Sequence, residues 1–183
     1  MIRLIPRGLR FAGVGLALFL PLCGVAGEGS AEPGGFAYAG TRLGISENPH
    51  VRHAEAFTDW QVPGALALGG GLGLKAYVSG SLGWLGDDHN DTVTGSLGPS
   101  LRLTYEPLPV ALVFGSAPTF LGRNNLGGRN LGCAFQFTSH VGLMWEVIPG
   151  WELGYRAQHI SNAGIGSDNP GLNSHFAVLA WRF

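Results

Sequence analysis

The chain has little charge, little cysteine and few long hydrophobic runs. Charged residues make up 13% of its 183 residues and nearly cancel, to a net charge of −1, which excludes the basic surface that nucleic-acid binding requires. One of the two cysteines lies in the N-terminal leader, so Cys133 alone remains beyond it and an internal disulfide is excluded. The only long apolar run is also N-terminal, so no later segment is expected to span a bilayer as a helix.

The leader, residues 1–31, has the anatomy of a signal peptide. Three arginines precede an apolar stretch over residues 11–22, and small residues follow it. Cleavage after Ala26 and cleavage after Ala31 both fit this pattern. The stretch is short for a membrane-anchoring helix. We therefore expect an exported chain whose mature part, residues 32–183, is one domain.

The mature part reads as amphipathic runs separated by turn signals rich in glycine and proline. An even number of strands of about ten residues is typical of an outer-membrane β-barrel. The sequence therefore predicts an all-β fold, an eight-stranded antiparallel transmembrane barrel. The expected strands cover residues 36–46, 52–62, 72–85, 92–106, 110–121, 133–147, 151–161 and 174–183.

Alternation within the strands predicts which face meets lipid. In the sixth strand an apolar series from Phe135 to Val147 alternates with a polar series from Gln136 to Glu146. An eight-stranded barrel has a filled interior rather than a pore, so charges on its inner face must pair. The polar faces carry nearly balanced charges: Arg42, Lys75, Arg102, Arg156 and Arg182 against Glu55, Asp59, Glu106, Glu146 and Glu152.

Aromatic residues near strand ends support this fold, because membrane barrels carry aromatic girdles at both interfaces. The chain ends in Phe183, which resembles the terminal signature of outer-membrane barrels. Both ends of an even-stranded barrel lie on the periplasmic side, so the seventh strand, 151–161, should run outward to the cell surface. The aromatics in question are Trp60, Trp84, Tyr105, Trp145, Trp151 and Trp181.

Two residues of the seventh strand conflict with its apolar outer face. His159 and Ser161 have the parity of the lipid-facing residues, at the end of the strand expected near the outer leaflet. Residues two apart on a strand point the same way, with Cβ atoms roughly 7 Å apart, so a modest rotation would join imidazole and hydroxyl as in acyl transfer. The spacing alone also fits two polar residues at the headgroup level.

The segment that begins at His159 resembles the signature of lipid A 3-O-deacylases of the PagL type. The likeness covers His-Ile-Ser-Asn-Ala-Gly over residues 159–164 and Asn-Pro-Gly over 169–171, on the penultimate strand and final loop. It implies a hydrolase without cofactors that releases the 3-hydroxyacyl chain ester-linked at the 3-position of lipid A. The implied partner is lipopolysaccharide in the outer leaflet of a Gram-negative outer membrane.

Roles carried over from this family follow the matching positions. Ser161 corresponds to the nucleophile and His159 to the general base. Asn169 corresponds to an oxyanion donor, and Asn162, a further residue of the motif, is grouped with it at the predicted oxyanion site. A backbone N–H near Gly164 is our own candidate for another donor.

One position departs from the family pattern. The third member of the family triad is a glutamate fourteen residues after the histidine, where this chain has Asn173. An asparagine orients an imidazole but carries no charge. Three interpretations remain open: Asn173 suffices, Asp168 reaches in from the loop, or the site is slow or inactive.

The alternative function is therefore a non-catalytic outer-membrane barrel with a degraded triad, which adheres, stabilises the membrane or binds a partner. The remaining histidines lack the spacing of a metal site, so none is expected. The sequence leaves open whether the barrel forms a homodimer.

Overall fold

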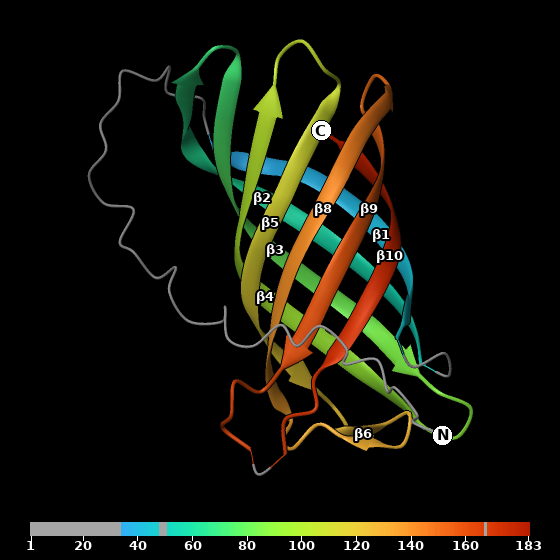
Figure 1. The fold of residues 1–183 in the computed structure, drawn as a ribbon. Helices are drawn as coiled ribbons and strands as arrows, with labels where there is room; N and C mark the ends of the chain where they lie inside the picture. The colour runs from blue at the N-terminus through green and yellow to red at the C-terminus, as the bar shows by residue number, and fades with distance from the viewer. Residues whose placement is uncertain (1–33, 48–50, 167) are drawn as a thin grey trace, which may run out of the picture.

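The computed structural model describes residues 34–47, 51–166 and 168–183. The predicted signal peptide and its two possible cleavage positions lie outside the described residues. Eight long strands close into an antiparallel barrel in the order β1-β10-β9-β8-β5-β4-β3-β2, and a two-stranded hairpin, β6–β7, accompanies it (Figure 1). The strands are β1 Gly35–Ser46, β2 Arg52–Gly69, β3 Leu72–Gly86, β4 Asp91–Tyr105, β5 Val110–Leu121, β6 Asn125–Leu126, β7 Arg129–Asn130, β8 Phe135–Ile148, β9 Trp151–Ser161 and β10 Leu172–Arg182.

The predicted faces are confirmed along the strands. The outer wall is apolar, with Leu43, Leu82 and Leu143 among its exposed side chains. All six aromatic residues named above are exposed, as an interfacial girdle requires. Among the described residues, no helix is long and apolar enough to cross a membrane.

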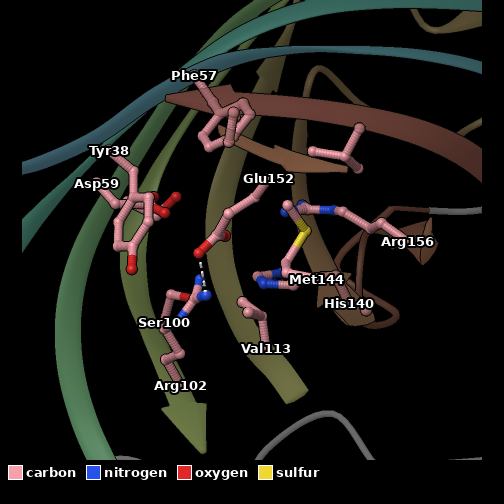
Figure 2. Close-up of a pocket in the computed structure, with 14 residues that line it drawn as sticks. Tyr38, Phe57, Asp59, Ser100, Arg102, Val113, His140, Met144, Glu152 and Arg156 are labelled. Carbon is pink, nitrogen blue, oxygen red and sulfur yellow. Dashed lines mark hydrogen bonds and ion pairs between the residues drawn. The ribbon is translucent and has the colours of Figure 1, made fainter. Parts of the chain in front are cut away.

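Charged side chains fill the barrel interior, as the balanced charges of the sequence predict. Arg102 Nη2 lies 2.6 Å from Glu152 Oε1 (Figure 2), and Arg42 Nε lies 3.5 Å from Glu55 Oε2 with both side chains buried. The Arg42 guanidinium also stacks over the ring of Phe57, 4.4 Å from its centroid. These groups separate a cavity of about 40 Å³ in the middle of the lumen from a larger one of about 520 Å³ toward the end that carries the C-terminus.

The turn expected over residues 63–71 is much shorter in the structure. Strand β2 continues through Pro63 to Gly69, because the β2–β3 register shifts between Gln61 and Ala65. A bulge tolerates a proline since the ladder hydrogen bond is already interrupted there. The hairpin then turns at Gly70-Gly71, both with positive φ, as a tight two-residue turn demands.

The loop expected over residues 122–132 contains the β6–β7 hairpin, which the sequence pattern did not reveal. Its strands have two residues each, too short to show alternation. The hairpin lies at the barrel end opposite the C-terminus (Figure 1). That end is the extracellular one by the rule that both termini of an even-stranded barrel are periplasmic.

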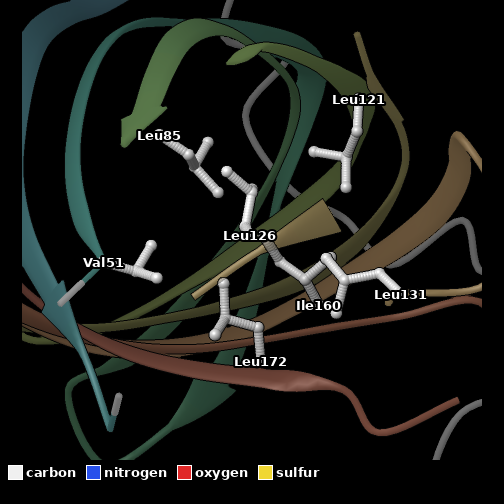
Figure 3. Close-up of a cluster of buried hydrophobic side chains, with 7 residues drawn as sticks. All are labelled: Val51, Leu85, Leu121, Leu126, Leu131, Ile160 and Leu172. Atoms are coloured by element: carbon white, nitrogen blue, oxygen red, sulfur yellow. The ribbon is translucent and has the colours of Figure 1, made fainter. Parts of the chain in front are cut away.

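An apolar cluster closes this extracellular end. Leu126 and Leu131 of the hairpin region pack against Ile160 of β9 and Leu172 of β10 (Figure 3). Apolar residues at the ends of the neighbouring strands complete this cluster, and all of its members are almost fully buried. We call it the apolar plug, and its residues are Val51, Leu85, Leu121, Leu126, Leu131, Ile160 and Leu172.

Candidate active site

The last residues of β9 alternate between the plug and the lipid-facing wall. Ile160 points inward and is 1% exposed, whereas His159 and Ser161 on either side of it are half-buried on the outer side. The strand period of two enforces this separation. The packing of Ile160 therefore fixes the face on which His159 and Ser161 appear.

Strand β10 brings Asn173 to His159. The two residues are cross-strand partners in the β9–β10 ladder, and His159 Nδ1 lies 2.6 Å from Asn173 Oδ1 in a side-chain hydrogen bond. An amide oxygen only accepts, so Nδ1–H is the donor and Nε2 is left with its lone pair. This is the tautomer that a general base acting through Nε2 requires.

Gly171 lies against the imidazole. A β-carbon at position 171 would lie 2.7 Å from Cε1 of His159, and the residue has a φ of +63°. Both features exclude a larger residue. The resulting close approach of the loop backbone limits the rotation of the ring.

Asn162 organises the loop that follows β9. Its side chain is fully buried, and Nδ2 donates to the carbonyl oxygens of Leu131 at 3.0 Å and Asp168 at 2.6 Å. Its Oδ1 accepts the N–H of Gly164 at 2.8 Å. Ala163 between them adopts a φ of +54°, a conformation that a non-glycine residue holds only where the surroundings impose it.

These contacts occupy two of the predicted oxyanion donors. The N–H of Gly164 already donates to Asn162 Oδ1, so it is not a free donor for a substrate. The side-chain amide of Asn162 is likewise occupied, by Leu131 and Asp168. The buried amide satisfies the backbone groups of two loops instead, because unpaired polar groups in such a place are costly.

Asn169 differs from these two residues. Its Oδ1 accepts the backbone N–H of Asn162 at 3.1 Å, and the residue is exposed. The Nδ2 group has no partner among the described residues and so keeps its donors for a ligand. The hydrogen bond from Asn162 restricts the amide plane in advance.

Asp168 is not the residue that contacts the imidazole. It is exposed, and within the described residues only its backbone oxygen takes part in this network. The hydroxyl of Ser161 has no hydrogen bond to any described group. Ser161 and His159 thus share a face, and because the imidazole is held, the Ser161 side chain must rotate for the two to meet; such loose geometry is common in catalytic sites without substrate.

No group of three or more His, Cys, Asp or Glu side chains in the described part of the chain is arranged to hold a metal ion. The arrangement consists instead of an imidazole held by an amide, a nearby hydroxyl and a free amide donor. These are the groups of nucleophilic acyl transfer.

Known proteins resemble the chain in both sequence and fold. The family described as lipid A 3-O-deacylase (PagL) matches residues 52–182. Lipid A deacylase PagL of Bordetella bronchiseptica is 39% identical over 69 residues, which are 38% of this chain and 39% of that protein. The crystal structure of the outer membrane enzyme PagL has a TM-score of 0.72 at 17% identity, covering 80% of this chain and all of that one.

Fold and site define an outer-membrane β-barrel with a polar, hydrolase-like constellation on its lipid-facing wall. Within that class the chain belongs to the lipid A 3-O-deacylase (PagL) family, whose model matches most of its length.

Sequence reasoning missed the roles of two glycines and one carbonyl group. Gly171 approaches His159, and Gly132 approaches the carbonyl oxygen of Asp168, where a β-carbon would lie 2.2 Å away. The Leu131 carbonyl ties the β6–β7 region to Asn162. Of these three features, only Gly171 lies in a motif that the sequence revealed, the Asn-Pro-Gly run. Close contacts between loops leave no periodic pattern in a sequence.

Proposed function

We propose that the chain is a serine esterase of the outer membrane that hydrolyses the ester-linked 3-hydroxyacyl chain at the 3-position of lipid A. The observation that carries this proposal is the Nδ1–Oδ1 hydrogen bond of 2.6 Å that holds His159 beside Ser161 on the lipid-facing wall. Lipid A forms the outer leaflet of this membrane, so its acyl esters would reach the wall without leaving the bilayer.

The proposed reaction proceeds by acyl transfer through Ser161. Its Oγ attacks the ester carbonyl carbon while its proton passes to His159 Nε2, and His159 Nδ1–H remains donated to Asn173 Oδ1. The tetrahedral oxyanion accepts a hydrogen bond from Asn169 Nδ2. When the intermediate collapses, the sugar oxygen leaves and takes the proton from Nε2.

Water completes the cycle. It attacks the acyl–Ser161 ester, gives a proton to His159 Nε2, and the second tetrahedral intermediate collapses to a free hydroxy fatty acid. The same proton then returns to Ser161 Oγ. No step requires a metal or a cofactor, since every proton moves between Ser161, His159, water and the sugar oxygen.

Asn173 is the proposed third member of the triad. It supplies the acceptor that orients the imidazole, but it adds no negative charge opposite the imidazolium that forms in the transition state. Turnover should therefore be slower than with a carboxylate at this position, while the tautomer of His159 remains correct.

The test is mass spectrometry of lipid A from a Gram-negative host that expresses the chain, compared with its Ser161→Ala variant. We expect the wild type alone to remove one ester-linked 3-hydroxyacyl mass. Thr41→Ala, which removes a hydroxyl from the lipid-facing side of β1, is the matched control and should behave as wild type. Heat-modifiable migration on gels reports folding of each barrel.

Unchanged lipid A in the presence of folded wild-type barrel would instead support the alternative, a barrel that keeps the fold without the chemistry. Full activity of Ser161→Ala would show that the nucleophile is another residue.

A further inference from the structure

A row of polar side chains crosses the lipid-facing wall at the level of His159. The register places Ser139 of β8 opposite His159 on one side and opposite Ser116 of β5 on the other. Asn173 extends the row on β10. Four neighbouring strands thus each contribute one polar residue to a wall that is otherwise mainly apolar, and the proposed reaction uses only two of the four.

Ser116 and Ser139 form a hydroxyl pair. Their Oγ atoms lie 3.0 Å apart, on the outer side of the barrel. Along β8 the neighbours of Ser139 on its own face are Phe137 and Val141, so apolar side chains lie above and below the polar row. Hydroxyls exposed to lipid cost on the order of 1–3 kcal/mol each unless they are partnered, and barrel closure requires neither of them.

The pair retains unused hydrogen-bonding capacity. Each hydroxyl has one donor and two acceptor positions, and the bond between the two serines uses one donor and one acceptor. One hydroxyl proton and several lone pairs therefore remain for a molecule on the lipid side. The outward direction of both side chains leaves lipid as the source of that molecule.

The position of the serine pair relative to Ser161, the proposed nucleophile, suggests which molecule the pair binds. Ser139 is directly opposite His159, and it is the diagonal neighbour of Ser161, whose partner on β8 is Phe137. Diagonal cross-strand neighbours are about 7–8 Å apart, and a reacting carbonyl carbon lies about 3–3.5 Å from its nucleophile. The hydroxyl oxygen on the third carbon of an acyl chain is three bonds from the carbonyl carbon, which is long enough to reach from there toward Ser139.

We propose that Ser116 and Ser139 form a subsite for the hydroxyl group on the third carbon of the scissile acyl chain. The subsite makes the enzyme prefer 3-hydroxyacyl esters over plain acyl esters of the same length. This inference rests on the esterase function proposed above and adds a residue-level origin for substrate choice.

The experiment compares two glucosamine esters in detergent micelles with the purified full-length mature barrel. One carries 3-hydroxytetradecanoate at the 3-position and the other carries tetradecanoate. The measured quantity is the ratio of kcat/KM for the hydroxylated ester to that for the plain ester. We expect a wild-type ratio of about ten, the size expected from one or two neutral hydrogen bonds.

The variants separate a specificity role from a structural one. Ser139→Ala should bring the ratio close to one, and Ser116→Ala should lower it about threefold because Ser139 loses its partner. Ser139→Thr keeps a hydroxyl and should keep the preference. Thr41→Ala, remote from the row on β1, should leave both the ratio and the rates unchanged.

Two results would overturn the subsite: a wild-type ratio near one, or an unchanged ratio in Ser139→Ala, which includes an equal loss on both esters. Cleavage of neither ester by folded wild-type barrel would instead overturn the esterase function itself, and the subsite with it. The two failures are distinguishable because only the second abolishes hydrolysis of the plain ester.

Discussion

Replacing Asn173 by aspartate isolates the charge that the triad lacks. The two side chains are isosteric, so the acceptor oxygen stays where Asn173 Oδ1 now lies, 2.6 Å from His159 Nδ1. Orientation and tautomer remain the same, and only the charge changes. We expect Asn173→Asp to raise kcat, since the imidazolium formed in the transition state gains a negative neighbour.

The size of the gain follows from the hydrogen bond. A neutral hydrogen bond contributes about 0.5–1.5 kcal/mol and one to a charged group about 1.5–3 kcal/mol. The difference, about 1–1.5 kcal/mol, corresponds to a roughly five- to tenfold increase in rate. A Coulomb energy of about 4 kcal/mol for charges 4 Å apart near a protein surface is an upper bound, because the site lies close to hydrated headgroups.

The assay is hydrolysis of the 3-hydroxyacyl glucosamine ester by purified wild type and variants under identical conditions. Asn173→Leu is the companion variant, because it removes the acceptor and should lower kcat about tenfold. Asn173→Glu tests how the distance of the charge from the backbone affects the rate, since glutamate is one methylene longer than aspartate. A wild type without activity beside an active Asn173→Asp would show that this one position had silenced the site.

A rate for Asn173→Asp equal to or below that of the wild type would refute the reasoning. It would mean that His159 does not become an imidazolium beside Asn173 during the rate-limiting step. The hydrogen bond would then serve only to hold the ends of β9 and β10 together.

Two further predictions concern the extracellular loops. Asn162→Ala removes three side-chain hydrogen bonds from a fully buried site. We therefore expect about tenfold lower activity and faster protease cleavage within residues 163–171, while heat-modifiable migration on gels stays unchanged. Protease resistance equal to that of the wild type would contradict this role of Asn162. The N–H of Gly127 in the β6–β7 turn and those of His89 and Asn90 donate to the carboxylate of Asp87 in the β3–β4 loop, and these hydrogen bonds lower the pKa of Asp87 to about 2. Because the folded-state pKa of Asp87 is lowered, these hydrogen bonds are complete above about pH 3.8 and weaken as the pH falls toward 2. The NMR chemical shift of the Gly127 amide should therefore titrate with a midpoint near pH 2. A midpoint near pH 4 would contradict this prediction.

The barrel could be predicted from the sequence because its causes are periodic. Alternation separated the lipid-facing series that includes Phe135 from the inward series that includes Gln136, and the structure buries the second and exposes the first. The same parity predicted that His159 and Ser161 would face outward, as they do. A period of two carries this information in every strand.

The closure of the loops was not predictable in the same way. The burial of Asn162 depends on a carbonyl group at Leu131, thirty-one positions earlier in the chain, and an asparagine shows no local sign of such a partner. Its place in the family motif suggested the oxyanion, whereas its three hydrogen bonds serve the loop. The extension of β2 through Pro63 likewise depends on a register shift against β3, which sequence periodicity does not specify.

The lumen is blocked in its middle and at its extracellular end, which leaves the outside of the barrel for the proposed chemistry. Ion pairs such as Arg102–Glu152 fill the interior, and the apolar plug closes the extracellular end, so a substrate reaches His159 only from the lipid side. Two of the strands that contribute to the plug, β9 and β10, also hold the site, because Ile160 alternates with His159 and Ser161 while Leu172 precedes Asn173. Substitutions that loosen the plug should therefore disturb the hydrogen bond between His159 and Asn173 before they open the barrel.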